Sequence, residues 1–500
     1  MDCSTLMVMI SFCTISYKLI EINIKKTGDR DKNRPAGVGR NLAARLIKIL
    51  KIMKILPKIT IGKKPNYLKF GEDINFFELF QKIESQFDTC FILESLGEEE
   101  KFSRYSLIGF NPSKIISGRE NILKIDDKKY KVANPYFALR EIMPDQVLAK
   151  NYAGGLVGYL SYEAVNYFEP SVNVKIHNLF DQFMFGVYED GIILDKHTHE
   201  LFYFYYKINR IEMLKKINLM KINKIKFKAQ FIKDNLTKKE HHKIVSSVKD
   251  EIIKGNTFQC EVGFKSEYKV SGNPLGIYKK LREINPSPFM YFLKFSNKQI
   301  IGASPELLFS LRDGEMTTRP LAGTIKRGKD EIEDRKLARI LLNDPKEKAE
   351  HSMLVDMQRN DLGRVAQFGT VRIRDLMSIK KFSHVQHISS EITGFIKPHE
   401  DMFSGLASNF PMGTVSGTPK VETTKIIDKN EPEARGPYGG GVGQFGFNGD
   451  CTFALTLRSI FIVNSYGYTQ TSGGIVYDSI PEKEYEEITR KLAAMKASCL

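Results

Sequence analysis

The sequence predicts an α+β fold in which two lobes of mixed strands and helices are joined by a basic linker. Many short segments have the period-two or continuous apolar pattern of strands, and a few longer segments have the spacing of helices. No G-x-G-x-x-G or Walker loop stands between a predicted strand and a predicted helix, so nucleotide chemistry has no support. This pattern favours a sandwich over a doubly wound sheet.

The first predicted lobe, residues 53–206, consists mainly of short strands. We expect a helix at 76–85, followed by strands at 90–95 and 105–110. A glycine-rich strand that runs into an aromatic helix is predicted at 152–168. Further strands are predicted at 182–188, at 191–194 and from Leu201, where aromatic residues are concentrated.

The second predicted lobe, residues 238–500, follows a segment at 207–237 that is rich in Lys, Ile and Asn and carries no motif. We interpret that segment as a partly helical linker. Helices are expected at 238–254, 274–284, 335–342 and 351–361, and strands at 258–270, 289–295 and 299–303. A glycine-rich stretch (435–450), a strand (454–463), a glycine turn (472–476) and an acidic helix complete the chain.

The composition is that of a globular protein whose basic excess lies outside the motifs. With 500 residues and 42% hydrophobic residues, the chain is neither a disordered nor a membrane type. The formal charge is +16, but residues 1–52 carry ten Lys/Arg against four Asp/Glu, and residues 207–240 carry eleven against three. The excess therefore belongs to a predicted basic leader at 1–52 and to the linker, which disfavours a nucleic-acid binder. Six scattered cysteines without a C-x-x-C pair fit a reducing cytoplasm.

Two pairs of carboxylates at helical spacing are candidates for chemistry. Glu347 and Glu350 form one pair, and Glu484 and Glu487 form the other, with Lys491 one turn further on. A spacing of three residues places both side chains on one helical face. Four carboxylates at one place would repel one another unless a hard, oxygen-ligated cation such as Mg²⁺ lay among them. Spacing alone leaves a solvated helix face as the alternative.

A series of motifs in fixed order resembles the chorismate-utilising enzymes. The segments are GASPELL (302–308), RPLAGTIKRG (319–328), KAEHSMLVDMQRNDLGRV (348–365), HVQHISSEITG (384–394), FPMGTVSGTPKV (410–421), LTLRS (455–459) and IVYDSIPEKEYEEITRK (475–491). Residues 65–200 resemble the N-terminal half of the large subunit of anthranilate synthases. The resemblance implies a two-lobed antiparallel β-sandwich with flanking helices that acts on chorismate with Mg²⁺.

The resemblance also implies a role for each of the four carboxylates. Glu350 and Glu487 match the direct metal ligands, whereas Glu347 and Glu484 match an outer pair that acts through water. The metal would hold the ring carboxylate of chorismate and withdraw electrons as the C4 hydroxyl leaves.

Several residues match the contacts that this family makes with chorismate. Arg458 matches a bidentate arginine, which suits a planar carboxylate. Backbone N–H groups of a turn can bind a second carboxylate. The family usually has glycine where Ser472 stands. The full set of matching positions is Gly323, Thr324, Tyr438, Arg458, Ser472, Gly473, Gly474 and Lys491.

Two residues match groups that act on the reacting atoms. Glu306 matches the general acid for loss of the C4 hydroxyl, a carboxyl that desolvation must keep protonated near neutral pH. His387 matches the family's active-site histidine, whose role as orienting group, proton carrier or aid to pyruvate elimination stays open.

Two further positions distinguish between the reactions of the family. Relatives that add water carry a lysine base where this chain has Gln259, and glutamine cannot deprotonate water. The relatives that make 4-amino-4-deoxychorismate carry a lysine where this chain has Ala322. The resemblance therefore implies that ammonia adds at C2 and that pyruvate is eliminated to give anthranilate, the first step of tryptophan biosynthesis. A 4-amino-4-deoxychorismate synthase of folate synthesis and a non-catalytic paralogue are the alternatives.

The resemblance finally implies a regulator and a partner. The segments 93–95, 104–106 and 285–290 resemble a tryptophan feedback pocket lined by Glu94, Ser95, Pro288, Phe289 and Met290. No G-x-C-x-G elbow of an amidotransferase occurs in the sequence. Ammonia would therefore come from glutamine through a separate amidotransferase chain in a heterotetramer, and no nucleic-acid or membrane partner is expected.

Overall fold

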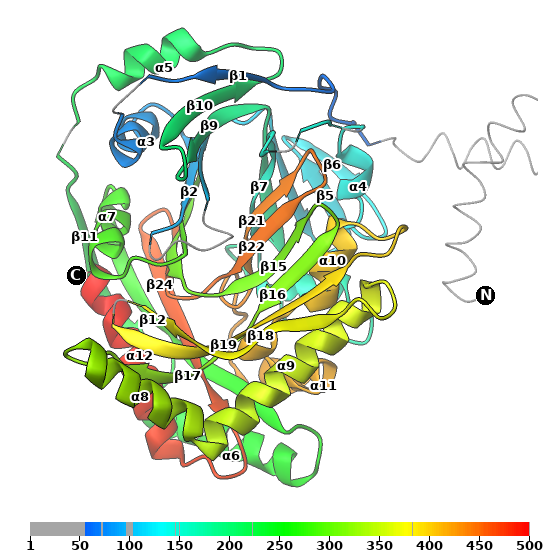
Figure 1. The fold of residues 1–500 in the computed structure, drawn as a ribbon. Coiled ribbons are helices and arrows are strands. Elements are labelled where there is room, and N and C mark those ends of the chain that lie inside the picture. The colour runs from blue at the N-terminus through cyan, green and yellow to red at the C-terminus, as the bar shows by residue number, and fades with distance from the viewer. Residues whose placement is uncertain are drawn as a thin grey trace, which may run out of the picture. The chain divides into compact units, whose positions relative to one another are not determined.

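A computed structural model describes residues 56–71, 74–96, 104–145, 147–149, 151–222, 224–382 and 384–499. The basic leader predicted at 1–52 lies outside these residues. Residues 57–500 form one compact unit built on two twelve-stranded sheets (Figure 1). Every strand pairing found among the described residues is antiparallel, so the predicted α+β antiparallel sandwich is confirmed.

The first sheet combines strands from both predicted lobes. Its order is β1-β10-β9-β3-β2-β13-β14-β23-β24-β12-β11, with β20 paired to β12. The strands from the first lobe are β1 (Asn66–Lys69), β2 (Thr89–Glu94), β3 (Tyr105–Phe110), β9 (Asp190–Asp195) and β10 (Glu200–Tyr205). The others are β11 (Phe227–Asp234), β12 (Gln259–Gly272), β13 (Phe289–Phe295), β14 (Lys298–Ser304), β20 (Gly417–Thr418), β23 (Ser459–Val463) and β24 (Tyr466–Ile475).

The second sheet combines the two lobes in the same way. Its order is β17-β19-β16-β15-β22-β21-β7-β8-β4-β5-β6, with β18 paired to β19. The strands from the first lobe are β4 (Lys114–Arg119), β5 (Ile122–Ile125), β6 (Lys128–Lys131), β7 (Gly155–Leu160) and β8 (Phe183–Tyr188). The others are β15 (Leu307–Arg312), β16 (Glu315–Arg319), β17 (Leu321–Lys326), β18 (Arg372–Lys381), β19 (Val385–Phe395), β21 (Gly441–Gly446) and β22 (Cys451–Leu455).

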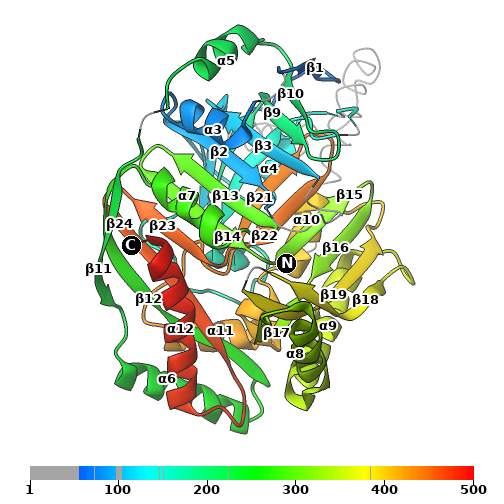
Figure 2. The same ribbon diagram turned by 60° about the vertical axis from the view of Figure 1, so that its left-hand side comes forward.

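The helices flank these sheets. α12 packs on β12 and β24, whereas α8 and α9 pack on β17 and β19 (Figure 2). The helices are α3 (Phe76–Glu84), α4 (Leu139–Ile142), α5 (Ile211–Asn218), α6 (Lys238–Ile253), α7 (Leu275–Ile284), α8 (Glu331–Asn343), α9 (Pro345–Val365), α10 (Met402–Asn409), α11 (Lys420–Asn430) and α12 (Pro481–Cys499), with 3₁₀ helices η1 (Tyr162–Tyr167) and η2 (Gly413–Val415). None of the helices in the described residues is long and apolar enough to cross a membrane.

Strand β13 shows why the first sheet is buried on both faces. Its side chains alternate between two apolar clusters, as the period of a strand requires. Met290 and Phe292 join the cluster that includes residues of α3 and α7, whereas Tyr291 and Leu293 join the cluster that includes residues of both sheets. The continuous apolar pattern of this strand therefore reflects its position between helices and the second sheet.

Three local expectations differ from the structure. The segment predicted as a linker at 207–237 carries α5 and the edge strand β11, which pairs with β12. Arg458 does not lie in a strand but in the connection between β22 and β23. Its φ of 47° is in the left-handed region, which interrupts the extended backbone. Ser472–Gly474 are not a turn, because they lie within β24 opposite residues of β12.

Candidate active site

The two predicted carboxylate pairs lie on α9 and α12, each against a strand that carries a glycine. α9 begins after Asp344, whose side chain accepts the N–H groups of Lys346 and Glu347. A Cβ atom on Gly323 would lie 2.9 Å from Glu347 Oε2, and one on Gly473 would lie 3.4 Å from Glu484 Oε2. The absence of side chains at these glycines therefore lets the two carboxylates approach the strands closely.

The carboxylates of the two helices influence one another electrostatically. Burial raises the pKa of Glu347, and the negative charges of Glu350 and Glu487 add to this rise. Burial also raises the pKa of Glu484, again with Glu487 contributing. For Glu487, burial opposes ionisation, but the Lys491 ammonium at 2.8 Å lowers its pKa. We call Glu347, Glu350, Glu484 and Glu487 the carboxylate site.

The carboxylate site has the donor chemistry of a Mg²⁺ site without its assembled geometry. Among the described residues, no three His, Cys, Asp or Glu side chains gather closely enough to hold a metal ion. The donors are all carboxylate oxygens, which a hard divalent cation prefers. Burial raises the pKa of Glu347, and the mutual repulsion of the carboxylates, which adds to this rise, is what a bound cation would relieve. The four glutamates therefore have the chemistry that a Mg²⁺ ion requires of its ligands.

Strand β12 places two polar side chains beside the carboxylate site. Gln259 Nε2 donates to Glu350 Oε1 at 3.2 Å. A Cβ atom on Gly474 would lie 2.6 Å from Gln259 Nε2 and 2.7 Å from Glu261 Oε1, so both side chains occupy the space above this glycine. Glu261 was not among the residues predicted from the sequence, although its period-two relation to Gln259 places both on one face of a strand.

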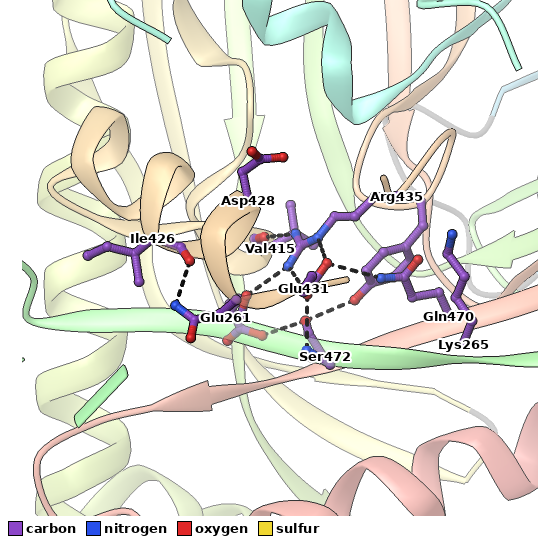
Figure 3. Close-up of polar contacts among 12 residues, drawn as sticks. Glu261, Lys265, Val415, Ile426, Asp428, Glu431, Arg435, Gln470 and Ser472 are labelled. Atoms are coloured by element: carbon purple, nitrogen blue, oxygen red, sulfur yellow. Dashed lines mark hydrogen bonds and ion pairs between the residues drawn. The ribbon is translucent and has the colours of Figure 1, made fainter. Parts of the chain in front are cut away.

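Glu261 belongs to a chain of three hydrogen-bonded side chains. Ser472 Oγ donates to Glu261 Oε2 at 2.7 Å, and Tyr438 Oη lies 2.9 Å from Ser472 Oγ. Burial raises the pKa of Glu261 to about 7, while the ammonium of Lys491 opposes the rise. Figure 3 shows the Glu261 and Ser472 side chains pointing toward each other.

The backbone of β24 presents polar groups on the side away from β12. On β12, Glu261 lies opposite Gly474 of β24, and Gly263 lies opposite Ser472. The N–H groups of Glu261 and Gly263 nevertheless donate away from β24, to Ser416 O and to Glu431 Oε1. In an antiparallel pair of this kind, the N–H and C=O groups of both residues point outward. The Ser472 carbonyl accordingly accepts from Lys491 Nζ at 3.1 Å. The N–H groups of residues 472 and 474 therefore face the side where Lys491 lies.

A second group of predicted residues lies around His387 on β19. His387 Nδ1 lies 2.8 Å from Gly323 O and 3.1 Å from Thr324 Oγ1. Because a carbonyl only accepts, Nδ1 carries the proton and Nε2 offers a lone pair, which Arg458 Nη2 approaches at 3.5 Å. Burial lowers the pKa of His387 to about 4, with the Arg458 charge adding to the effect. The imidazole is therefore neutral near pH 7 and orients the guanidinium.

Glu306 lies in the buried connection between β14 and β15. Its Oε1 accepts the Leu321 N–H at 3.3 Å and the Thr414 hydroxyl at 3.0 Å. Burial raises the pKa of Glu306 to about 8, against these two hydrogen bonds and with a contribution from the charge of Glu261. The carboxyl is therefore protonated near neutral pH, as a general acid requires.

The five residues predicted for feedback line one cavity of about 470 Å³ between strands of both sheets. Register brings the motifs together, since Met290 pairs with Glu94 across β13 and β2. The Glu94 carboxylate already accepts from Arg282 Nε at 2.6 Å and from Tyr278 Oη at 2.7 Å. Ser95 Oγ, in contrast, is buried with no hydrogen-bond partner among the described residues.

The chain is similar to known proteins over most of its length. Residues 88–497 match the family model described as chorismate binding enzyme. Anthranilate synthase component 1 of Leptospira biflexa is 54% identical over 449 residues, 88% of this chain and 97% of that relative. Aminodeoxychorismate synthase component 1 of Bacillus subtilis is 34% identical over 463 residues, 87% and 96%. The crystal structure of anthranilate synthase component I from Streptococcus pneumoniae matches with a TM-score of 0.70 at 28% identity, covering 86% of this chain and 98% of that one.

Proposed function

This chain belongs to the family of chorismate binding enzymes, and from that premise we propose that it is the large subunit of an anthranilate synthase. It converts chorismate and ammonia to anthranilate and pyruvate, the first step of tryptophan biosynthesis. The observation that carries this choice within the family is Gln259, whose amide contacts Glu350. A neutral amide cannot deprotonate water, so the nucleophile is ammonia.

The residues around His387 and β24 bind the carboxylates of chorismate. The Arg458 guanidinium, oriented by the neutral imidazole, donates to one carboxylate. The outward N–H groups of Ser472 and Gly474, together with Lys491, donate to a substrate carboxylate. This is either the second carboxylate of chorismate or the opposite side of the carboxylate that Arg458 binds. The carboxylates of a bound substrate are thereby matched by donors and positive charge.

Glu306 supplies the proton for departure of the C4 hydroxyl. Its raised pKa, about 8, keeps the carboxyl protonated until the leaving oxygen accepts the proton. Ammonia adds at C2 as the C4 hydroxyl leaves as water, and pyruvate is eliminated afterward as the ring becomes aromatic. His387, neutral and with Nδ1 committed to Gly323, serves as an orienting group rather than as an acid.

Mg²⁺ is the cofactor that fits the carboxylate site. Glu350 and Glu487 would hold it directly, and Glu347 and Glu484 would hold its waters. When bound, it supplies Lewis acidity at the ring carboxylate of the substrate.

Two features of regulation and supply complete the proposal. L-Tryptophan binds in the cavity lined by Glu94, Ser95 and Met290, where the Ser95 hydroxyl gains its missing partner. Its indole lies on the apolar lining, and its ammonium shares the Glu94 carboxylate with Arg282. A separate glutamine amidotransferase chain delivers ammonia in a cytoplasmic heterotetramer.

The decisive assay mixes the protein with chorismate, ammonium and Mg²⁺ and measures fluorescence and pyruvate, with and without tryptophan. The proposal predicts fluorescent anthranilate and pyruvate in equal amounts. Formation of 4-amino-4-deoxychorismate without pyruvate would instead identify the folate branch, which the Bacillus subtilis relative represents.

The variant Ala322→Lys tests the choice between the two amination reactions. Ala322 packs in a small buried cluster with Leu354 and Met357. A lysine there should divert or stall anthranilate formation, measured as the ratio of anthranilate to chorismate consumed. An unchanged ratio would show that position 322 does not select the reaction.

A further inference from the structure

The chain of Glu261, Ser472 and Tyr438 lies beside the residues proposed to bind the substrate carboxylates. We propose that this chain sets the direction in which the Tyr438 hydroxyl donates its proton, and that Glu261 is a positioning residue for substrate binding. The inference rests on the proposed function, since it takes chorismate as the ligand and Tyr438 as one of its contacts.

With Glu261 ionised, the chain runs toward the carboxylate. Ser472 Oγ has one proton and donates it to Glu261 Oε2 at 2.7 Å. Tyr438 Oη, 2.9 Å from Ser472 Oγ, must then donate its own proton to Ser472. The Tyr438 oxygen is left with lone pairs only, and lone pairs repel a substrate carboxylate.

With Glu261 protonated, the chain runs in the opposite direction. The carboxyl proton is donated to Ser472 Oγ, the Ser472 proton is donated to Tyr438 Oη, and the Tyr438 proton is free for the substrate. Only the two hydroxyl groups rotate, and no proton leaves its own oxygen within the chain. The net change is one proton that Glu261 takes up from solvent.

The surroundings of Glu261 fix its backbone but leave its carboxylate poorly neutralised. Arg435 Nη2 donates to the Glu261 backbone carbonyl at 2.7 Å and to Glu431 Oε1 at 2.7 Å (Figure 3). The guanidinium therefore neutralises the Glu431 carboxylate rather than that of Glu261. Burial raises the pKa of Glu261 to about 7, which makes both protonation states accessible near neutral pH. The charged groups that influence its carboxylate electrostatically are Lys491 and Glu487 from α12 and Glu350 from α9, and Glu261 in turn raises the pKa of Glu306 in the β14–β15 connection.

A dianionic substrate favours the protonated state of Glu261. An anion bound close to a buried carboxylate raises the free energy of the ionised form, and only the reversed chain offers the Tyr438 proton. Binding of chorismate is therefore linked to uptake of a proton, and its affinity falls as pH rises above the pKa of Glu261.

The test is calorimetric titration of chorismate without ammonium at saturating Mg²⁺, in two buffers of different ionisation enthalpy. For the wild type we expect uptake of up to one proton and a dissociation constant that rises on the order of tenfold between pH 6.5 and pH 8.5. Glu261→Gln keeps an N–H donor toward Ser472, so it should bind normally at pH 6.5, lose the proton uptake and bind more tightly than the wild type at pH 8.5.

Two further variants separate the chain from general damage. Ser472→Ala should weaken binding at both pH values and abolish the pH dependence. Glu422→Gln, which removes a half-exposed carboxylate of α11 whose ion-pair partner Lys425 is also half-exposed, should behave as the wild type. Anthranilate formation by Glu261→Gln at pH 6.5 establishes that this variant is folded.

The outcomes separate this inference from the proposed function. Proton uptake that persists in Glu261→Gln, or a Glu261→Gln variant as weak as Ser472→Ala at pH 6.5, would overturn the inference. Chorismate binding by the wild type without proton uptake would also overturn it while leaving the proposed function intact. A wild type that neither binds chorismate nor forms anthranilate would contradict the proposed function itself.

Discussion

The carboxylate site and the cavity around Ser95 differ in how much of their lining is charged. In the carboxylate site the charged groups act on one another, since Glu487 is paired with Lys491 and raises the pKa of Glu347. The cavity has a largely apolar lining, in which the Glu94 carboxylate is already paired with Arg282. Two buried polar atoms of its lining, Ser95 Oγ and Gln444 Oε1, have no hydrogen-bond partner in the part of the chain that the structure describes.

This difference indicates what each site can bind. The four glutamates of the carboxylate site outnumber the Lys491 ammonium that pairs with Glu487, so the site suits a metal together with an anionic substrate. The cavity offers apolar surface and single hydrogen bonds, which suit an aromatic ligand with few polar groups. Charge changes should therefore act strongly at the first site, and loss of a hydroxyl should act weakly at the second.

The largest effect is expected for Glu350→Gln. The substitution keeps the shape of the side chain but removes a charge from the proposed metal site, so Mg²⁺-dependent turnover should disappear while the melting temperature stays near that of the wild type. The matched control is Glu482→Gln, a half-exposed glutamate of α12 that pairs with Lys238. Full Mg²⁺-dependent activity in Glu350→Gln would disprove the metal assignment.

Glu306→Gln should reduce kcat by about 10²–10⁴-fold, because it removes the general acid. The wild-type kcat should fall as pH rises through about 8, where Glu306 loses its proton. The free energy of unfolding should also fall as pH rises. The folded pKa exceeds the unfolded value, so the folded state binds more protons and stability falls as pH rises from about 4 toward 8.

Thermal melts of the Glu306→Gln variant test that sign. An amide has no such linkage, so the melting temperature of the variant relative to the wild type should increase from pH 5 to pH 8. A difference that does not change with pH would show that Glu306 has an ordinary pKa in the folded protein.

Glu347→Gln should weaken the affinity for Mg²⁺ by about 10–100-fold, as expected for a residue that holds metal-bound water. At saturating Mg²⁺ its kcat should stay near the wild-type value. Activity measured against Mg²⁺ concentration gives both quantities. A loss of kcat that Mg²⁺ does not restore would place Glu347 among the direct ligands.

The smallest effect is expected in the cavity. Ser95→Ala should weaken tryptophan inhibition by about 2- to 10-fold, the value of one hydrogen bond, with kcat unchanged. The inhibition constant measures this, and Ser113→Ala, whose hydroxyl contacts Glu189 instead, is the control. Unchanged inhibition in Ser95→Ala would show that the hydroxyl does not contact the ligand.

Elements with a strong local pattern were predictable from the sequence. The helix predicted at 76–85 is α3, and the strands predicted at 105–110 and 289–295 are β3 and β13. These segments have apolar residues at the period that burial of one or both faces requires. The strand β18 (Arg372–Lys381) was not predicted, because its sequence has many charged residues. It belongs to the sheet through its pairing with β19, which the local pattern does not show.

The candidate site depends on information that local sequence does not hold. Motif order located Glu306, His387 and the carboxylate pairs, but the left-handed backbone of Arg458 is set by its surroundings. Ser472–Gly474 looks like a turn until its pairing with β12 is known. Glu261 lies outside the family motifs, and its hydrogen bond to Ser472 is known only once β12 and β24 are seen to pair.

The central claim is that α9 and α12 hold one cation between them. Crystals soaked with Mn²⁺ in place of Mg²⁺ test it most directly by anomalous diffraction. We expect a single strong peak bound by both Glu350 and Glu487, and its loss in Glu350→Gln. A peak bound by only one of the two helices, or no peak at these residues, would show that the helices do not share a cation.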